Sequence, residues 1–540
     1  MARRSAAVYA ACILLFMSMI MQLFVASQGR QYAQAAARQS TCTLEAGTAR
    51  GVIYDCHFQP LVGRQDSAVT AVVPTPQSAA WLLGRAAGSR RTALLAQLQG
   101  GRPFLYAGDL TGCPDASVFH LPVRYGPGSL APHVVGYLDS GGRHGVAGIE
   151  AACDGLLRGF GGRRALRCQV DAAGHALAGG AEAVGSSAPP VGGVVLTLDS
   201  GIQRAAQQAL DESGCPAGAV VVLDIWTGAI RAMASAPAYD QNDVAAALGR
   251  SDAPLLNRAL CAYSVGSTFK LAVAAAALEQ GIPAQTSFSC PGYALVDGQV
   301  FHCHNLAGHG SLDMQQALEH SCNVYFIQLA RRVGAAPVRA MAQRLGFGRA
   351  TQLAQGLRGA AGSLTPLQDL TGGEFANFSF GQGQLTATPL QLAVMTAAIA
   401  NGGQTVVPRL VQGTTADGRT LSQTVPEYAV TRAMSVKTAA ALQQMMIGVV
   451  TGGSGSAAAP AAGGAGGKTA SAQTGVTDSG GREVVHAWFS GFYPAQTPHW
   501  AIVVLCEGGG SGGSTAAPVF RRVADAIAAL GYVADDSKMP

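Results

Sequence analysis

An apolar run opens the chain: residues 6–26 are almost wholly apolar and follow Arg3 and Arg4. About 20 apolar residues suffice for one helix across a bilayer, and arginines before the span favour a cytoplasmic N-terminus. We therefore predict that residues 1–30 form a cytoplasmic stub and an uncleaved signal-anchor of a single-pass cell-membrane protein, with the rest of the chain extracytoplasmic. The alternative is a signal peptide cleaved at Ala33-Gln34-Ala35, although its apolar core is usually only about 7–15 residues long.

Beyond the anchor, the apolar runs become short and are separated by Gly and Pro turns. We predict one domain over residues 31–175. Residues 176–193 are rich in Ala, Gly, Ser and Pro, which predicts a linker into a second domain, residues 194–540. A chain of 540 residues, 49% hydrophobic and 12% charged, is long and apolar enough for such domains to bury real cores.

The second domain is predicted to have strands near both ends and Ala-rich helices between them. β-Branched runs predict buried strands, Asp199 before an apolar-periodic run predicts a capped helix, and the last helix has apolar residues along one face. The predicted strands are Val194–Leu198, Ala219–Leu223, Trp488–Phe492 and Trp500–Cys506, and the predicted helices are Ile202–Leu210, Leu271–Leu278 and Ala517–Leu530.

The first candidate chemistry is the sequence Ser267-Thr268-Phe269-Lys270, directly before the predicted helix Leu271–Leu278. We expect Ser267 in the first helical turn, with the Cβ of Lys270 about 5–6 Å away on the same face. Serine is a weak nucleophile that needs a base, and lysine becomes one when burial or a second cation lowers its pKa from about 10.4. The helix N-terminus adds N–H groups where an oxyanion would form.

Lysine is rare in this chain, which gives each lysine weight. Lys270, Lys437, Lys468 and Lys538 are the only lysines among 36 basic residues. Lysine differs from arginine chiefly because it can lose its proton. A helix cap followed by a solvated lysine is the plain alternative for an isolated S-x-x-K.

Two further motifs follow in order. Ser321-Cys322-Asn323 precedes a helix-like run, where Ser321 can relay a proton and Asn323 can hold a substrate amide. Lys468-Thr469-Ala470 precedes the predicted strand Trp488–Phe492. The motifs S-x-x-K, S-x-N and K-T-G are typical of penicillin-binding proteins and class A β-lactamases.

With these motifs the chain resembles a class B penicillin-binding protein over nearly its whole length. The resemblance implies an α/β serine transpeptidase or β-lactamase-like fold, in which helices cover a five-stranded antiparallel sheet. It also implies a mostly β pedestal domain of the dimerisation type at 31–175 and a penicillin-binding transpeptidase domain at 194–540. Further family-like stretches are Arg50–Asp55, His133–Tyr137, Gly145–Glu150, Leu196–Asp199, Gly218–Asp224, Leu256–Ala259, Gly381–Gly383, Thr388–Gln391 and His486–Phe489.

The resemblance implies a role for each catalytic residue. Ser267 attacks the carbonyl between the two terminal D-alanines of a peptidoglycan stem peptide, and Lys270 takes its proton. Ser321 passes a proton to the leaving D-alanine, and Lys468 and Asn323 tune that path. Repulsion from Lys468 is also expected to lower the pKa of Lys270.

The strand that follows is implied to bind the substrate. Thr469 would hold the substrate carboxylate, and the N–H groups of Ser471 and Ser267 would form the oxyanion hole. Ala470 replaces the family's usual glycine, and we expect its Cβ to narrow the cleft or to change the affinity for β-lactams. The Gly-, Ala- and Ser-rich segment 452–467 is expected to be a mobile loop beside the site.

The implied partners are peptidoglycan stem peptides, β-lactams as inhibitors, and a polytopic membrane glycosyltransferase. A net charge of +5 without a Lys/Arg-rich run argues against nucleic acid. Two alternatives stay open: a catalytically weak scaffold for that polymerase, and a β-lactamase or β-lactam sensor. Roles in elongation, division and sporulation are equally compatible with the sequence.

The chain has 12 cysteines, and Cys12 in the predicted span leaves an odd number outside it. Extracytoplasmic placement permits disulfides. Cys290 and Cys303 flank a hairpin-like stretch and are the pair to test first, with free thiols as the alternative. Because no C-x-x-C pair or His-rich cluster has metal-ligand spacing, we predict no zinc, no other metal and no cofactor. Cys322 is expected to be a small buried residue rather than a nucleophile.

Overall fold

The structure, a computed structural model, describes residues 2–28, 40–63, 65–126, 128–177, 181–185, 190–426, 430–478 and 480–532. Contacts divide the chain into two compact units. Unit 1 comprises residues 1–50, 65–124 and 161–190, and unit 2 comprises residues 51–64, 125–160 and 191–540. The alternative cleavage site Ala33-Gln34-Ala35 lies outside the described residues.

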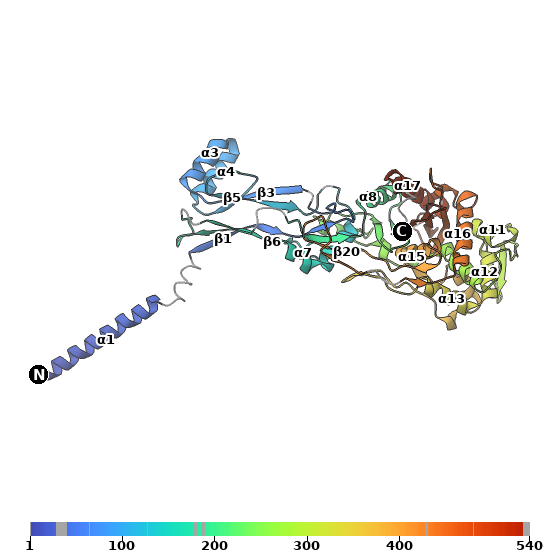
Figure 1. Cartoon of the computed structure of the whole chain (residues 1–540), viewed down its shortest axis with the longest axis horizontal. Coiled ribbons are helices and arrows are strands. Elements are labelled where there is room, and N and C mark those ends of the chain that lie inside the picture. Colours follow the sequence, from blue (N-terminus) through green and yellow to red (C-terminus); the bar gives the residue numbers. More distant parts are fainter. Residues whose placement is uncertain are drawn as a thin grey trace. The chain divides into compact units, whose positions relative to one another are not determined.

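The predicted membrane span is a single helix, α1 (Ala2–Gln28), drawn in blue in Figure 1. Its stretch Arg4–Ser27 has a mean hydropathy of 2.3, and the side chains of that stretch are exposed to solvent in the protein alone. A helix of this length with apolar side chains on all sides is stabilised when lipid surrounds it. The helix therefore fits a single-pass membrane anchor, as predicted.

The rest of unit 1 is mostly β. Two three-stranded sheets, with strand orders β1-β6-β7 and β4-β3-β5, share a core to which Ala71, Phe119 and Leu166 contribute. Strand β7 lies within the predicted linker 176–193 and pairs with β6. The elements are β1 (Thr41–Ala49), β3 (Gln65–Val72), α3 (Pro76–Arg85), α4 (Gly88–Gln99), β4 (Phe104–Ala107), β5 (Ala116–Val123), β6 (Gly162–Gln169) and β7 (Glu182–Val184).

Unit 2 is built on a five-stranded antiparallel sheet with the order β10-β9-β25-β24-β23. Its central strands are apolar at nearly every position because both faces are covered. In β9, Val220 and Val222 join one core cluster, whereas Val221 and Leu223 join the other, as expected when successive side chains alternate between faces. The strands are β9 (Gly218–Asp224), β10 (Ile230–Ala236), β23 (Gly466–Thr477), β24 (Glu483–Tyr493) and β25 (Trp500–Cys506).

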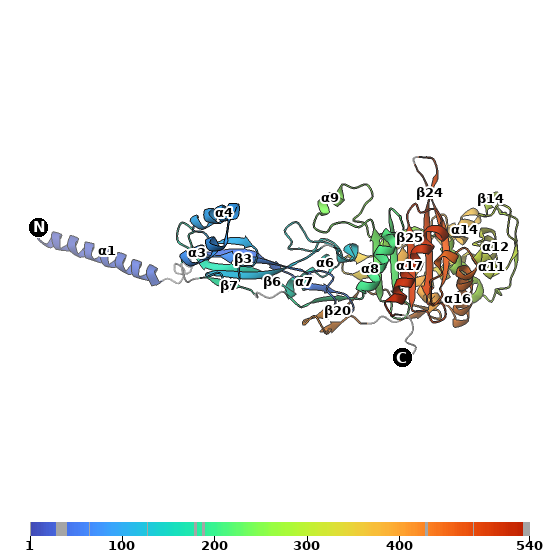
Figure 2. The same ribbon diagram turned by 90° about the horizontal axis from the view of Figure 1, so that it is seen from above.

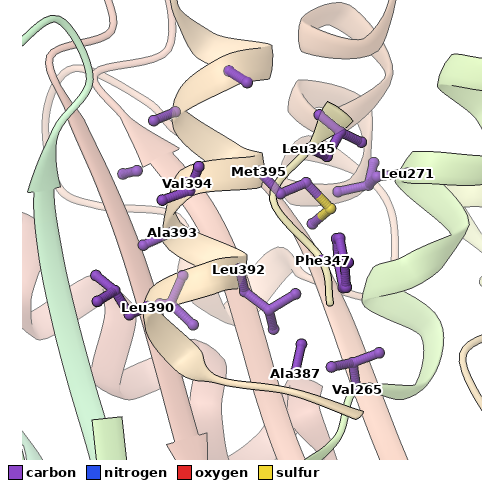
Figure 3. Packing of buried hydrophobic residues seen from close by; sticks show 14 of the residues in the cluster. Val265, Leu271, Leu345, Phe347, Ala387, Leu390, Leu392, Ala393, Val394 and Met395 are labelled. Atoms are coloured by element: carbon purple, nitrogen blue, oxygen red, sulfur yellow. The ribbon is translucent and has the colours of Figure 1, made fainter. Parts of the chain in front are cut away.

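Helices form a layer on each face of this sheet (Figure 2). On one face lie α8 (Ser200–Asp211), capped by Asp199 as predicted, and α17 (Ala517–Ala529). On the other face lie α10 (Lys270–Glu279), α15 (Pro389–Ala400) and α16 (Val436–Thr451). Figure 3 shows Met395 of α15 extending toward Leu271 of α10, so that α15 fills the space between the sheet and α10.

The other elements of unit 2 surround this sandwich, and several carry the candidate site. A small sheet has the order β2-β8-β20-β21, and β13 pairs with β14 as the predicted hairpin. The elements are β2 (Val52–Tyr54), α5 (Pro132–Val135), α6 (Gly148–Ala152), α7 (Asp154–Phe160), β8 (Gly193–Leu196), α9 (Val244–Leu248), β11 (Tyr263–Ser264), β12 (Phe288–Cys290), β13 (Tyr293–Val296), β14 (Gln299–His302), β15 (Gly310–Leu312), α11 (Met314–Glu319), α12 (Asn323–Val333), α13 (Ala335–Arg344), β16 (Gln352–Ala354), β17 (Leu357–Arg358), α14 (Gly372–Ser379), β18 (Thr386–Ala387), β19 (Gln404–Thr405), β20 (Val411–Thr415), β21 (Gln423–Thr424) and β22 (Thr431–Arg432).

Candidate active site

Ser267 lies in a 3₁₀ turn, Gly266–Phe269, that continues directly into helix α10. Gly266 has a φ of +53°, a conformation that favours glycine. A Cβ at Gly266 would lie 3.1 Å from the Ala472 Cβ and 3.3 Å from the Ala470 Cβ, so the turn is in close contact with strand β23. The sequence thus predicted correctly that Ser267 sits at the start of a helix.

A cleft of about 1150 Å³ opens in front of this turn. It brings together parts of the chain that are about two hundred residues apart in sequence. Its lining includes six of the predicted site residues: Ser267, Ser321, Asn323, Thr469, Ala470 and Ser471. The other two, Lys270 and Lys468, lie fully buried beneath the cleft.

We call Lys270, Ser321 and Lys468 the lysine cluster. Lys270 Nζ donates to the Ser321 carbonyl oxygen at 2.6 Å and to Asn323 Oδ1 at 2.8 Å, and lies 3.3 Å from Ser321 Oγ. Lys468 Nζ donates to Ser321 Oγ at 2.9 Å and to the Thr469 carbonyl oxygen at 2.9 Å. The Ser321 hydroxyl therefore connects two buried amines.

Burial lowers the pKa of Lys270 to about 7 and outweighs the opposing effects of Cys322 and Cys303. The pKa of Lys468 is well below its ordinary value, first because of burial and then because of the nearby charge of Lys270. The expectation that repulsion from Lys468 lowers the pKa of Lys270 is thus corrected: burial is the cause, because desolvation penalises the charged amine. Lys270 can be a neutral base near pH 7.

In the part of the chain that the structure describes, the Ser267 hydroxyl has no hydrogen-bond partner. The Lys270 amine is instead held by Ser321 and Asn323. Catalytic hydrogen bonds are often long before substrate binds and tighten in the reactive complex. The pairing of Ser267 with Lys270 therefore stays a prediction of the spacing.

Ser321 has an unusual backbone conformation between α11 and α12, with a φ of +53°. Left-handed conformations are uncommon for residues other than glycine and cluster at functional sites. Here the conformation lets Ser321 present both its carbonyl and its hydroxyl oxygen to Lys270. The S-x-N motif is therefore a shaped turn, and Asn323 begins helix α12.

Strand β23 lies at the edge of the sheet, and its residues alternate between the cleft and the core. Ser471 is exposed and accepts the Gly512 N–H at 3.2 Å, and Thr469 Oγ1 lies 2.8 Å from Ser454 Oγ. Ala470 is 3% exposed and belongs to the core cluster, facing Gly266. Its Cβ therefore packs against the turn that carries Ser267, although Ala470 also lines the cleft, and its effect on the width of the cleft stays a prediction.

Ser454 is a cleft residue that the sequence analysis missed, because it lies in the segment 452–467 that was expected to be mobile. Parts of this segment pack against neighbouring residues, whereas residues 461–464 are exposed, so its mobility stays a prediction. The Ser454 N–H donates to the Glu319 carbonyl oxygen at 3.0 Å, and a Cβ at Gly467 would lie 2.3 Å from the Phe489 ring. The glycines permit close packing, which composition alone does not distinguish from mobility.

A second cluster lies directly behind the Ser321–Asn323 turn. We call Cys290, Cys303, His309 and Cys322 the thiol cluster, because their sulfur and nitrogen atoms all lie within 4.8 Å of one another. Cys290 and Cys303 are free thiols, not the disulfide that was the first pair to test. The spacing argument against a metal site therefore fails here, because the fold gathers potential ligands that are not adjacent in sequence.

Comparisons with known proteins agree with this geometry. Residues 218–525 match the family of the penicillin binding protein transpeptidase domain. The chain is 33% identical over 435 residues to the peptidoglycan D,D-transpeptidase PbpA of Mycolicibacterium smegmatis, covering 75% of this chain and 84% of that protein.

Solved structures with the same fold include the D,D-transpeptidase domain of a peptidoglycan glycosyltransferase from Eggerthella lenta. Its TM-score is 0.66 at 27% identity, covering 90% of this chain and 99% of that chain. The ceftriaxone acyl-enzyme complex of penicillin-binding protein A from M. tuberculosis has a TM-score of 0.64 at 28% identity, covering 76% of this chain and 93% of that chain. The chain therefore belongs to the penicillin-binding protein transpeptidase family, within its class B members.

Proposed function

We propose that this chain is a membrane-anchored serine D,D-transpeptidase that cross-links peptidoglycan stem peptides through an acyl-enzyme on Ser267. The observation that carries the proposal is the lysine cluster: two fully buried lysines on one serine hydroxyl, directly beneath a cleft that contains a second serine at a helix start. Relatives that are named as D,D-transpeptidases and solved as β-lactam acyl-enzymes support the same reaction.

In the acylation step, neutral Lys270 accepts the Ser267 hydroxyl proton while the serine oxygen attacks the carbonyl carbon between the terminal D-alanines. A base with a pKa near the working pH is efficient for this transfer. As the C–N bond breaks, Ser321 donates a proton to the leaving D-alanine nitrogen. Its 2.9 Å hydrogen bond from Lys468 and its 3.3 Å approach to Lys270 support this relay, because either amine can resupply the proton.

The cleft also offers groups for the charges of the substrate. Thr469, with its hydroxyl 2.8 Å from that of Ser454, is proposed to bind the terminal carboxylate of the stem peptide. The N–H groups of Ser267 and Ser471 are proposed to stabilise the oxyanion. Edge strands have backbone groups that the sheet does not use, and the first N–H groups of a helix are likewise unpaired, which supports both assignments.

The acyl-enzyme is resolved when an amine of a neighbouring stem peptide attacks the ester carbonyl, which forms the cross-link and releases Ser267. A β-lactam presents a strained amide in place of the D-Ala-D-Ala peptide bond. Its ring opening leaves the leaving nitrogen tethered in the cleft. We propose that β-lactams therefore inhibit the enzyme by a long-lived ester on Ser267.

We further propose that the N-terminus is cytoplasmic and the catalytic unit extracytoplasmic, because Arg3 and Arg4 precede the span. The partner we propose is a polytopic membrane glycosyltransferase that docks on α1 and unit 1. Co-purification of such a polymerase from membranes, lost when apolar positions of α1 are replaced, is the expected result. Recovery of no polymerase with the intact chain would remove this partner.

The test of the reaction is intact-mass analysis of the full-length chain in detergent after exposure to penicillin, with Ser267→Ala as the control. We expect a long-lived adduct of the mass of the drug on the parent and none on the variant. No adduct on the parent would instead support a scaffold of the membrane polymerase. A short-lived adduct accompanied by hydrolysed penicillin would support a β-lactamase.

A further inference from the structure

We infer that the thiol cluster binds one zinc ion, and that this ion holds the Ser321–Asn323 turn in place behind the lysine cluster. The argument begins with distances. Cys290 Sγ and Cys303 Sγ each lie 3.6 Å from His309 Nδ1, and Cys303 Sγ lies 3.9 Å from Cys322 Sγ. All four atoms lie within 4.8 Å of one another.

These separations are those of a tetrahedral zinc site. Zinc bonds of about 2.3 Å to sulfur and about 2.0–2.1 Å to nitrogen, at tetrahedral angles, put two sulfurs about 3.8 Å apart and a sulfur and a nitrogen about 3.6 Å apart. Three thiols and one imidazole are a usual ligand set for structural zinc, and four protein ligands fill its coordination. Tetrahedral sulfur-rich sites select zinc over calcium or magnesium.

Disulfide bonding explains the cluster less well. A disulfide needs sulfurs about 2.05 Å apart, whereas Cys303 Sγ and Cys322 Sγ are 3.9 Å apart. Pairing any two of the three cysteines would also leave the third as a buried thiol. The three cysteines are at most 2% exposed. One ion at their centre would be coordinated by all three sulfur atoms, so that no buried thiol is left over.

The surrounding backbone is built to hold these ligands. The Cys303 N–H donates to the Gly292 carbonyl oxygen at 2.8 Å, and the His309 N–H donates to the Cys290 carbonyl oxygen at 3.0 Å. Gly308 has a φ of +85°, and a Cβ there would lie 2.4 Å from the same Cys290 oxygen. The end of strand β12 and the loop 303–309 thereby lie side by side, with their ligand side chains converging.

The fourth ligand connects this site to catalysis. Cys322 is the N-cap of α12, where its sulfur accepts the Tyr325 N–H at 3.4 Å, and hydrogen bonds of this kind orient metal ligands. Its neighbours Ser321 and Asn323 both accept hydrogen bonds from Lys270. Zinc at Cys322 would therefore fix the uncommon backbone conformation of Ser321. Cys322 is a positioning residue in this proposal.

Metal analysis of the full-length chain, purified in detergent without chelator, tests the proposal. We expect about one zinc per chain in the parent. The variants Cys290→Ser and His309→Gln should each lose most of this zinc. Neither residue has a role in the proposed reaction. The matched control is Cys506→Ser, a fully buried cysteine outside the cluster, which should keep its zinc.

A second measurement covers the case in which the variants fail to fold. Chelator treatment of the parent should remove the zinc and lower the apparent Tm, and added zinc alone should restore both. Cobalt(II) added to the zinc-free parent should give the visible absorption of tetrahedral, thiolate-bound cobalt. The proposal is overturned if the purified parent contains no zinc and its Tm does not change when zinc is added, or if it contains iron in place of zinc. It is also overturned if Cys290→Ser and His309→Gln keep their zinc, or if non-reducing peptide mapping finds a disulfide within the cluster.

Discussion

Two buried clusters meet at the Ser321–Asn323 turn, and they satisfy their polar groups in different ways. In the lysine cluster, each amine donates to oxygen atoms of the protein at 2.6–2.9 Å. In the thiol cluster, the sulfur and nitrogen atoms face chiefly one another, at 3.6–3.9 Å. The first arrangement is complete with protein atoms alone, whereas the second has the geometry of a shell around an ion.

This difference indicates that one cluster takes part in the reaction and that the other positions the turn. Burial lowers the pKa of Lys270 to about 7, so this amine can exchange protons near neutral pH and the lysine cluster can take part in the reaction. A closed four-ligand metal site offers no open position for substrate, so the thiol cluster can act only by holding the turn. Changes in the first should alter the rate with the fold intact, and changes in the second should alter the fold and, through it, the rate.

The largest expected effect comes from Lys270→Met, which removes the proposed base at nearly constant volume. Acylation of Ser267 by a fluorescent penicillin should slow by about 10²–10⁴-fold, the usual contribution of a general base. The zinc content should not fall, because Lys270 lies outside the thiol cluster, and the Tm should fall somewhat because Ser321 and Asn323 lose a hydrogen-bond donor.

The matched control is Lys437→Met, which changes one of the few other lysines, exposed on α16. It should acylate as fast as the parent. Lys270→Arg should be as slow as Lys270→Met, because arginine does not release its proton at accessible pH. If Lys270→Met were acylated as fast as the parent, Lys270 would not be the base of the acylation step.

The next effect is a pH dependence of acylation. Burial lowers the pKa of Lys270 to about 7, with Lys468, Cys303 and Cys322 as the titratable groups that face it. Only the neutral amine is a base, so the rate should rise about tenfold per pH unit below pH 7 and level off above it. Rates measured between about pH 5 and pH 9, with folding followed in parallel, check this. A flat profile in the folded range contradicts the assignment of Lys270 as the base.

A smaller effect is expected for Thr469→Val, which keeps the side-chain shape and removes the hydroxyl. A hydrogen bond to a charged group contributes about 1.5–3 kcal/mol, so acylation should slow by about 10- to 10²-fold. Ser454→Ala removes one hydrogen-bond partner of the Thr469 hydroxyl and leaves the 3.5 Å contact from Lys468 Nζ, so it should have less effect. A penicillin ester that lacks the carboxylate should react equally with the parent and with Thr469→Val; an unequal loss would assign Thr469 another role.

The smallest effect is expected for Ala470→Gly. Glycine within a strand costs about 0.5–1 kcal/mol relative to alanine, and the Ala470 Cβ is buried against Gly266. Thermal unfolding should occur at a slightly lower temperature, with an acylation rate close to that of the parent. A large gain in β-lactam affinity would show that the Ala470 Cβ does limit the cleft.

Much of the fold could be predicted from local patterns. The Asp199 cap marks α8, the strand Trp500–Cys506 was predicted with the bounds that the structure has, and the helix predicted at Ala517–Leu530 ends one residue earlier. These predictions succeed because caps, periodicity and β-branched runs act over a few residues. The mobility of segment 452–467 could not be decided from composition, because glycine serves close packing as well as mobility: Gly455 and Gly467 pack against Phe489, whereas residues 461–464 are exposed.

The sequence alone determined the chemical parts of the site: a serine and a lysine one helical turn apart, a Ser-x-Asn turn, and a Lys-Thr pair entering a strand. Tertiary structure decided what these parts can do. Burial, which lowers the pKa of Lys270, depends on neighbours about fifty to two hundred residues away. The thiol cluster likewise forms only when the end of strand β12, the loop 303–309 and the start of helix α12 converge. Local periodicity depends on residues that are neighbours in the sequence. Desolvation of a side chain and the convergence of distant residues depend on how the whole chain packs.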